Sequence, residues 1–309
     1  MQLKKIKKGA TVGIVCPARG ISLNSKSFIL LEERLNKIGL KVKYGATVGK
    51  SFGYLADTDE MRIQDIENMF LDKEVDVILA MLGGYGCSRI VDKINYEIIK
   101  KNPKPLIGFS DITVLLNAIY QKTRIPTIHG PVGIYLGKQN FDDFSLADFE
   151  NILFKSQKMR VLKNPKDDAI TFKSGKATGK LVGGNLSLIT TLMGTPYEID
   201  FTGKIVFLED VDESLYRIDR YFSTLKLSGM LEKAKGFVFG YFTNITLEEN
   251  SFTLTDLINQ YFGNLNVPII TNFNSGHDLP FISLPIGVDV ELDADLKQIT
   301  ILKELYASN

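Results

Sequence analysis

Short apolar runs alternate with amphipathic segments through the first 130 residues. Apolar, β-branched stretches predict strands at 11–16, 41–44, 75–81, 105–109 and 125–128. Between them, apolar residues spaced by three or four positions predict helices over 27–40 and about 59–71. Strands that alternate with helices are typical of a parallel sheet with helices on its faces. The pattern therefore predicts an α/β domain at the N-terminus.

The pattern becomes less regular after residue 140. A helical stretch and a long polar segment indicate a linker region over 141–178. One helix is predicted over 185–193 and another around 216–227, among strand-like runs at 204–208, 235–241, 268–271 and 287–302. A chain of 309 residues suits two domains. We expect an N-terminal α/β domain over 1–140 and a mixed, β-rich C-terminal domain over 179–309.

Composition narrows the possible partners. With 37 basic and 36 acidic residues, the net charge of +1 argues against nucleic-acid binding. No apolar run is long enough to cross a membrane, and the first one reads as a strand rather than a signal peptide, so a cytoplasmic protein without a membrane partner is expected. Two cysteines cannot form a disulfide framework, and no Cys/His cluster has zinc-ligand spacing, so no metal is expected.

Ser110 stands where an apolar run passes straight into a helical pattern, in KPLIGFSDITVLLNAIYQ. A serine at a strand-to-helix corner is exposed at the apex, and the first N–H groups of the helix point at the same space. This placement suits a nucleophile beside an oxyanion site. The alternative is that Ser110 only caps the helix.

A serine nucleophile needs a base and a carboxylate that orients it. The chain has two histidines, His129 after a predicted strand and His277 in a Gly- and Pro-rich loop. Glu209 follows four apolar residues at the end of a predicted strand, where its carboxylate can reach a neighbouring loop. The order Ser, Glu, His occurs in α/β-hydrolases, although Ile112 stands where their nucleophile elbow has its second glycine.

A glycine-rich turn, LGGYGCSRI, follows another predicted strand. Gly83, Gly84 and Gly86 can leave N–H groups free to bind an anion. The turn does not fit the dinucleotide-binding motif, because Arg89 occupies the place of the third glycine. It is interpreted as one wall of an active site or as an ordinary tight turn. Cys87, just beyond it, is a rival nucleophile or a packing residue.

Seven segments together resemble one family. Their order and spacing are similar to those of the LD-carboxypeptidases, serine peptidases that trim muropeptides and include the microcin C self-immunity peptidase. The resemblance covers nearly the whole chain. It rests on the segments LADTDEMRIQDIENMF, LGGYGCSRI, IGFSDIT, IHGPV, GGNLSLITTLMGTPY, FLEDVDESLYRIDR and SGHDLPFISLPIG.

The resemblance implies a catalytic triad in which Ser110 is the nucleophile, Glu209 the carboxylate and His277 the base. It implies a Rossmann-like N-terminal domain, a C-terminal β-rich domain that contributes Glu and His, and a site between the two. It also implies a homodimer that needs no metal or cofactor. The expected reaction is hydrolysis of the L,D bond to the terminal D-alanine of a muropeptide tetrapeptide, with the oxyanion bound by the backbone N–H groups of Asp111 and Gly84.

One position departs from the family pattern, because Leu82 stands where the family has arginine before Gly-Gly-Tyr-Gly. Arg19 and Arg89 are candidates to replace that arginine, and Gly83, Tyr85 and Arg89 are the candidate substrate-binding residues. Two other functions stay open. One is a self-immunity peptidase that cleaves a nucleotide-peptide conjugate, although the chain has no Trp for stacking on a base. The other is a non-catalytic module that binds cell-wall peptides.

Overall fold

A computed structural model describes residues 3–22, 26–155, 157–247 and 251–307. The chain divides into two compact units. The first comprises 1–157 with 283–287 and 304–309, and the second comprises 158–282 with 288–303. The region 141–178 contributes its first part to the first unit and its second part to the other.

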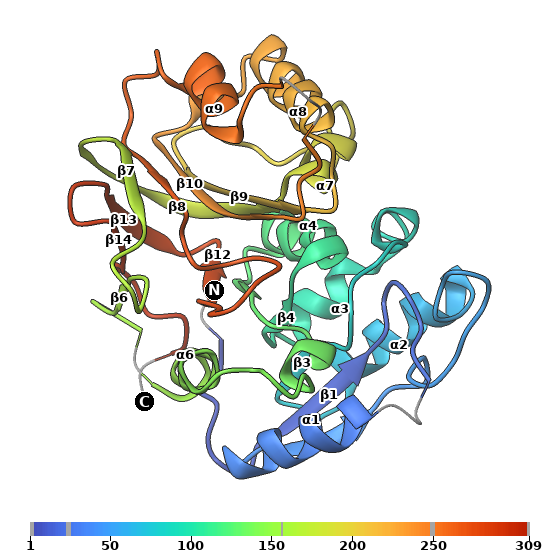
Figure 1. Cartoon of the computed structure of the whole chain (residues 1–309). Coiled ribbons are helices and arrows are strands. Elements are labelled where there is room, and N and C mark those ends of the chain that lie inside the picture. The colour runs from blue at the N-terminus through green and yellow to red at the C-terminus, as the bar shows by residue number, and fades with distance from the viewer. Residues whose placement is uncertain (1–2, 23–25, 156, 248–250, 308–309) are drawn as a thin grey trace. The chain divides into compact units, whose positions relative to one another are not determined.

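A mostly parallel sheet forms the centre of the first unit (Figure 1). Its strands are β1 (Thr11–Val15), β2 (Lys41–Tyr44), β3 (Val77–Ala80), β4 (Leu106–Gly108), β5 (Thr127–His129) and β12 (Leu284–Ile286). Within the described residues the strand order is β12-β5-β4-β3-β1-β2. The strands β1 to β5 pair in parallel, as predicted, whereas β12 comes from the far end of the chain and pairs antiparallel with β5.

Helices connect these strands and fall into two packing groups. They are α1 (Lys26–Lys37), α2 (Asp59–Leu71), α3 (Tyr96–Lys101), α4 (Thr113–Thr123), α5 (Gly133–Leu136) and α6 (Asp143–Phe154), with 3₁₀ turns η1 (Cys87–Arg89) and η2 (Ser110–Ile112). The first group is α1 with α5, and the second runs from α2 through α3 to α4. Side chains of the central strands, such as Ile14, Leu79 and Ile107, are fully buried, as expected for a parallel sheet covered on both faces.

The second unit is built on a mixed sheet. Its strands are β6 (Val161–Leu162), β7 (Ile170–Lys173), β8 (Lys176–Asn185), β9 (Ile205–Val211), β10 (Gly236–Thr243), β11 (Ile269–Thr271), β13 (Asp289–Asp293) and β14 (Gln298–Ile301). Their order among the described residues is β6-β14-β13-β8-β9-β10-β11-β7, with β8 to β11 parallel. The strand-like run 287–302 consists of the antiparallel pair β13 and β14.

Three helices among the described residues and a phenylalanine cluster complete the second unit. The helices are α7 (Leu186–Thr191), α8 (Leu215–Leu227) and α9 (Leu254–Phe262), with the 3₁₀ turn η3 (Leu231–Lys233). The ring centroid of Phe262 lies 4.9 Å from that of Phe237 and 5.0 Å from those of Phe222 and Phe239, all in edge-to-face geometry. These contacts fix α8 and α9 on the strand β10. The predicted fold class, a parallel α/β domain followed by a β-rich mixed domain, is confirmed.

Candidate active site

Ser110 lies at a sharp corner between β4 and α4. Its φ of 62° places a non-glycine residue in the left-handed region. Such a conformation costs on the order of 1–3 kcal/mol and is found most often at functional sites. The residues at the N-cap positions of η2 and α4 are Phe109 and Ile112, so Ser110 is not the residue that caps either element. The corner thus holds the Ser110 side chain in a strained position that capping does not explain.

The glycine turn after β3 lies directly against this corner. A Cβ built on Gly83 would sit 2.8 Å from Ser110 Cβ, 2.9 Å from Ser110 Oγ and 3.4 Å from the backbone nitrogen of Asp111. Only glycine leaves room for the Ser110 hydroxyl at this point. The next residue, Gly84, has a φ of 111°. The strands β3 and β4 are neighbours in a parallel sheet, so their carboxyl ends bring the two turns together.

Asp111 connects the two turns. Its side chain is buried, and its Oδ2 accepts a hydrogen bond from the backbone N–H of Cys87 at 2.8 Å. The Cys87 thiol is also buried, and this burial, followed by the Asp111 carboxylate, raises the pKa of Cys87 well above its usual value. A buried thiol that stays protonated is not a nucleophile. Cys87 is therefore a packing residue behind the serine corner.

The two candidate arginines occupy different surroundings. Arg89 donates from Nε and Nη2 to the two carboxylate oxygens of Asp59 at 3.0 and 3.1 Å. This pairing holds the pKa of Asp59 below its usual value. Arg19 follows β1 and is exposed, and within the described residues its guanidinium forms no ion pair. A Cβ on Gly84 would lie 2.8 Å from Arg19 Cβ, so Arg19 packs against the glycine turn.

Arg19 lines an open cavity of about 740 Å³ together with Gly84, Tyr85 and Tyr54. The two tyrosines are 48% and 66% exposed, and their ring centroids are 5.8 Å apart. Aromatic rings this exposed on a cavity wall can pack against a ligand. The carboxyl ends of β1, β3 and β4 thus present a cation, a glycine turn and a serine along one edge of the sheet.

Glu209 and His277 form a buried pair within the second unit. The Glu209 side chain is fully buried near the end of β9, and its Oε2 lies 2.7 Å from Nδ1 of His277. Gly276 has a φ of 123°, and a Cβ there would lie 2.9 Å from Glu209 Oε2. Glycine before the histidine therefore allows the loop to approach the carboxylate. The pair has the geometry in which a carboxylate fixes the tautomer of an imidazole base.

The charge of this pair shifts the pKa of His277. Burial acts to lower it, but the Glu209 carboxylate, with smaller contributions from Asp210 and Asp212, outweighs burial and raises the pKa above 6.5. Asp210 points to other partners. Its carboxylate accepts hydrogen bonds at 2.9 Å from the Asn185 side chain and from the backbone N–H of Ser187, which ties the start of α7 to β9. Burial, followed by the charge of Glu209, raises the pKa of Asp210 to about 7.

His129, the other candidate base, is fully buried in β5. Its ring packs edge-on against Phe109 with centroids 5.9 Å apart. A base that exchanges protons with substrate and water needs access to both, which a completely buried ring in the sheet lacks. This setting assigns His129 a packing role.

The part of the chain that the structure describes contains neither a metal-binding cluster nor a membrane-spanning helix. No group of three or more His, Cys, Asp or Glu side chains is arranged there to hold a metal ion. None of the helices described has the length and apolar character needed to span a membrane.

Two family models match the chain. Residues 12–130 match the LD-carboxypeptidase N-terminal domain, and residues 178–292 match the LD-carboxypeptidase C-terminal domain. The chain belongs to the LD-carboxypeptidase family. The protein is therefore a serine-type carboxypeptidase, and the resemblance seen in its sequence motifs is confirmed.

Individual relatives agree with this membership. The chain is 37% identical over 295 residues to a probable murein peptide carboxypeptidase of Bacillus subtilis, covering 94% of this chain and 91% of that protein. It is 26% identical over 327 residues to the microcin C7 self-immunity protein MccF of Escherichia coli, covering 97% and 95%. The solved structure of MccF in complex with glutamyl sulfamoyl guanosine has the same fold, with a TM-score of 0.92 over 99% of each chain at 24% identity.

Sequence motifs alone do not single out Asn185 and Gly276, and they place Asp210 only beside Glu209 at the same strand end. The motifs do not distinguish Arg19 from Arg89, but the position of Arg19 after β1 does. Residues that follow neighbouring parallel strands meet at one edge of a sheet, and Arg19, Gly83 and Ser110 follow β1, β3 and β4. This rule favours Arg19 over Arg89 as the arginine at the site.

Proposed function

We propose that the protein hydrolyses the L,D peptide bond to the terminal D-alanine of muropeptide tetrapeptides. The observation that carries the proposal is the buried Glu209–His277 pair at 2.7 Å, which is the acid-base half of a serine triad. Ser110, at its strained corner, is the proposed nucleophile. The similarity to a murein peptide carboxypeptidase, higher than that to the self-immunity protein, supports a muropeptide substrate.

In the proposed mechanism the Ser110 hydroxyl attacks the carbonyl of the scissile bond, and Nε2 of His277 takes its proton. Glu209 accepts the Nδ1–H hydrogen bond and stabilises the imidazolium that forms. The backbone N–H groups of Asp111 and Gly84 bind the oxyanion. His277 then returns the proton to the departing amine of D-alanine, and a water molecule activated by His277 releases the acyl group from Ser110.

An exopeptidase must also recognise the terminal carboxylate, and we assign this role to Arg19. A buried or half-buried carboxylate needs a cationic or hydrogen-bonding partner. Arg89 already donates to both oxygens of Asp59, whereas Arg19 is exposed beside Gly84. Arg19 thus supplies the positive charge that the family arginine, replaced here by Leu82, would otherwise contribute. Gly83 and Tyr85 complete the proposed substrate-binding wall.

A nucleotide-peptide conjugate is the second candidate substrate. The exposed pair of Tyr54 and Tyr85 favours it, because two aromatic rings on a cavity wall can stack on a nucleobase without a Trp. A purely non-catalytic binding module is disfavoured, because all three triad positions are filled and Glu209 and His277 pair at 2.7 Å. We also propose that the protein acts in the cytoplasm and forms a homodimer.

Parallel digestion of three substrates tests the proposal. Tetrapeptide, pentapeptide and an aminoacyl-sulfamoyl adenosine are incubated with the protein and with Ser110→Ala, and the products are quantified by mass spectrometry. We expect release of D-alanine from the tetrapeptide only. The D,D bond of the pentapeptide should resist hydrolysis, because the D-configured residue on its acyl side displaces the carbonyl from the oxyanion donors. A displacement of about 1 Å lowers the rate on the order of a hundredfold. Preferential cleavage of the adenosine conjugate would favour the self-immunity function instead.

A further inference from the structure

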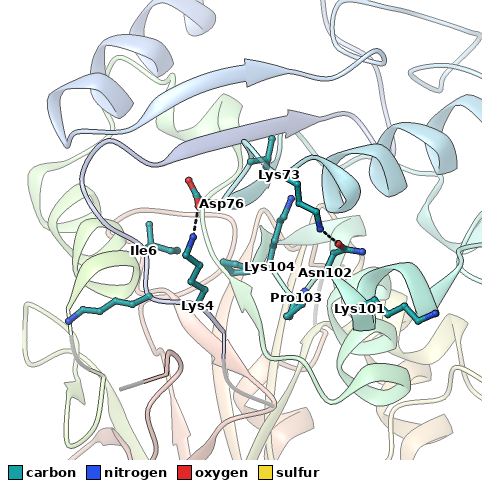
Figure 2. Close-up of a pocket in the computed structure, with 11 residues that line it drawn as sticks. Lys4, Ile6, Lys73, Asp76, Lys101, Asn102, Pro103 and Lys104 are labelled. Atoms are coloured by element: carbon teal, nitrogen blue, oxygen red, sulfur yellow. Dashed lines mark hydrogen bonds and ion pairs between the residues drawn. The ribbon is translucent and has the colours of Figure 1, made fainter. Parts of the chain in front are cut away.

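A second cavity, of about 280 Å³, lies in the first unit where chain segments enter the strands β1, β3 and β4 (Figure 2). Three short segments line it, 4–6 before β1, 73–76 before β3 and 101–105 before β4. Ser110 and the glycine turn follow the same strands at their other ends. The cavity is therefore at the opposite edge of the sheet from the proposed nucleophile and plays no part in the reaction proposed there.

The charge of the lining is strongly positive. It contains five lysines and one aspartate, namely Lys4, Lys5, Lys73, Lys101, Lys104 and Asp76. The whole chain, in contrast, has a net charge of only +1. A concave surface lined by one sign of charge concentrates ions of the opposite sign.

The acidic groups nearby are already engaged. Asp76 accepts a hydrogen bond from the backbone N–H of Thr11 at 3.1 Å, and its other oxygen lies 4.0 Å from Lys4 Nζ. Asp72 and Glu74 both pair with Lys43, at 2.6 and 2.8 Å. Lys43 does not line the cavity. Because Asp72 and Glu74 pair with Lys43, the positive charge of the lining lysines exceeds the negative charge around them.

Two of the lysines are held in place by the protein. Lys104 Nζ donates hydrogen bonds to the backbone carbonyls of Met69, at 2.8 Å, and Asp72, at the end of α2. Burial is the largest influence on the pKa of Lys104 and lowers it to about 8; the Asp72 carboxylate opposes this shift, and the charge of Lys73 adds to it. Lys73 Nζ donates to Asn102 Oδ1 at 2.6 Å, as Figure 2 shows. Such ammonium groups need less ordering to meet an anion than lysines that move freely in solvent.

Apart from the lysines, Asp76 and Asn102, the cavity is lined by apolar residues. Ile6 and Val75 are buried beneath it, and Pro103 and Pro105 flank Lys104. The prolines offer no N–H donors, so the lysine ammonium groups are the main groups of the lining that can bind an anion. A volume near 300 Å³ is at the small end for ligand sites. These features suit a small ligand that carries a multiply charged anionic group.

We propose that this cavity binds a small phosphate-bearing anion, such as a sugar phosphate or pyrophosphate. Lysine acts as a point charge toward phosphate, so several ammonium groups around one cavity favour a dianion over a single carboxylate. Lys4 and Lys73 would contact the phosphate oxygens from two sides, and Lys104 would add its charge from the floor. Lys5 and Lys101 would contribute long-range attraction.

Calorimetric titration of the full chain with pyrophosphate and with ribose 5-phosphate tests this site. The ionic strength is held at about 0.15 M, where exposed charges more than about 8 Å apart are largely screened. The test variant is Lys4→Gln with Lys73→Gln, and the matched control is Lys37→Gln with Lys41→Gln. The control removes the same charge from exposed positions of the same unit that do not line the cavity. Thermal melts establish that both variants are folded.

We expect saturable binding to one site, weakened on the order of tenfold or more in the test variant and less than about twofold in the control. Absence of saturable binding of either probe to the natural chain would overturn the proposal. Equal weakening in both double variants would also overturn it, because it would show diffuse attraction rather than a site. Binding of anionic vesicles or RNA through Lys4 and Lys73, without binding of either phosphate, would replace it with a macromolecular surface.

Discussion

Replacing Glu209 by glutamine tests the acid-base half of the site most directly. The change keeps the size of the side chain and removes its charge at a fully buried position 2.7 Å from His277 Nδ1. In the natural protein this carboxylate is the main reason that the pKa of His277 is raised despite burial. Without it, burial dominates and the pKa of His277 falls. Catalysis needs the neutral imidazole, so the acid limb of the rate profile should move to lower pH.

The rate at the plateau should fall at the same time. Two unit charges about 4 Å apart attract by about 4 kcal/mol at an effective dielectric constant of about 20. Loss of that stabilisation of the imidazolium in the transition state corresponds to roughly a thousandfold in kcat. A glutamine that turns its NH₂ toward Nδ1 also selects the wrong tautomer, which raises the expected loss to about ten-thousandfold. The variant should thus have a lower maximal rate than the natural protein but keep that rate down to a lower pH.

Two measurements separate this outcome from mere structural damage. Tetrapeptide hydrolysis is followed from pH 4.5 to 9, with Glu232→Gln as a control because Glu232 is an exposed glutamate of the same unit. Imidazole resonances in NMR report the titration without turnover, and they are simple to assign because the chain has only two histidines. A lower plateau with an unmoved acid limb and an unmoved His277 titration would refute the proposed coupling. A fully active Glu209→Gln would refute the triad itself.

Five further substitutions probe the rest of the site. Ser110→Ala should reduce tetrapeptide hydrolysis at least about a thousandfold in a folded protein, whereas Cys87→Ala should keep most activity; the reverse result would exchange the nucleophile. Gly276→Ala forces a Cβ to within 2.9 Å of Glu209 Oε2 at a φ of 123°. We expect the unfolding free energy, measured by urea denaturation, to fall by about 1–3 kcal/mol. We expect kcat in the peptide assay to fall roughly a hundredfold. Arg19→Ala should lower kcat/KM roughly tenfold for the tetrapeptide and little for its C-terminal amide, whereas Arg89→Ala should not show this difference between the two substrates. If Arg19→Ala keeps the preference for the acid over the amide, Arg19 does not recognise the carboxylate.

Most strands of the first unit were predictable because they are short, buried apolar runs between helical segments. The exception is β2, KVKY, which is half-exposed and carries two lysines. The predicted runs from 11–16 to 125–128 correspond to β1 through β5. The strand β12 was not predictable in this role, because its pairing with β5 is set by tertiary structure across more than 150 positions of the chain. The strand β8 was missed for a different reason. Its sequence KATGKLVGGN is rich in glycine and lysine, and such strands form where backbones approach closely rather than where a side-chain pattern repeats.

The neighbouring carboxylates of Glu209 and Asp210 show where sequence reasoning ends within the site. The apolar run Ile205–Leu208 indicated that an acidic residue leaves the end of a buried strand. Successive side chains of a strand point to opposite faces, so only one of the two can orient a given histidine. The choice depends on which face meets the 277 loop, and local pattern does not contain that information. In the structure Glu209 faces His277, whereas Asp210 holds Asn185 and Ser187 on the other side. The second carboxylate therefore supports the strand end from which the first one acts, and its own charge adds to the raised pKa of His277.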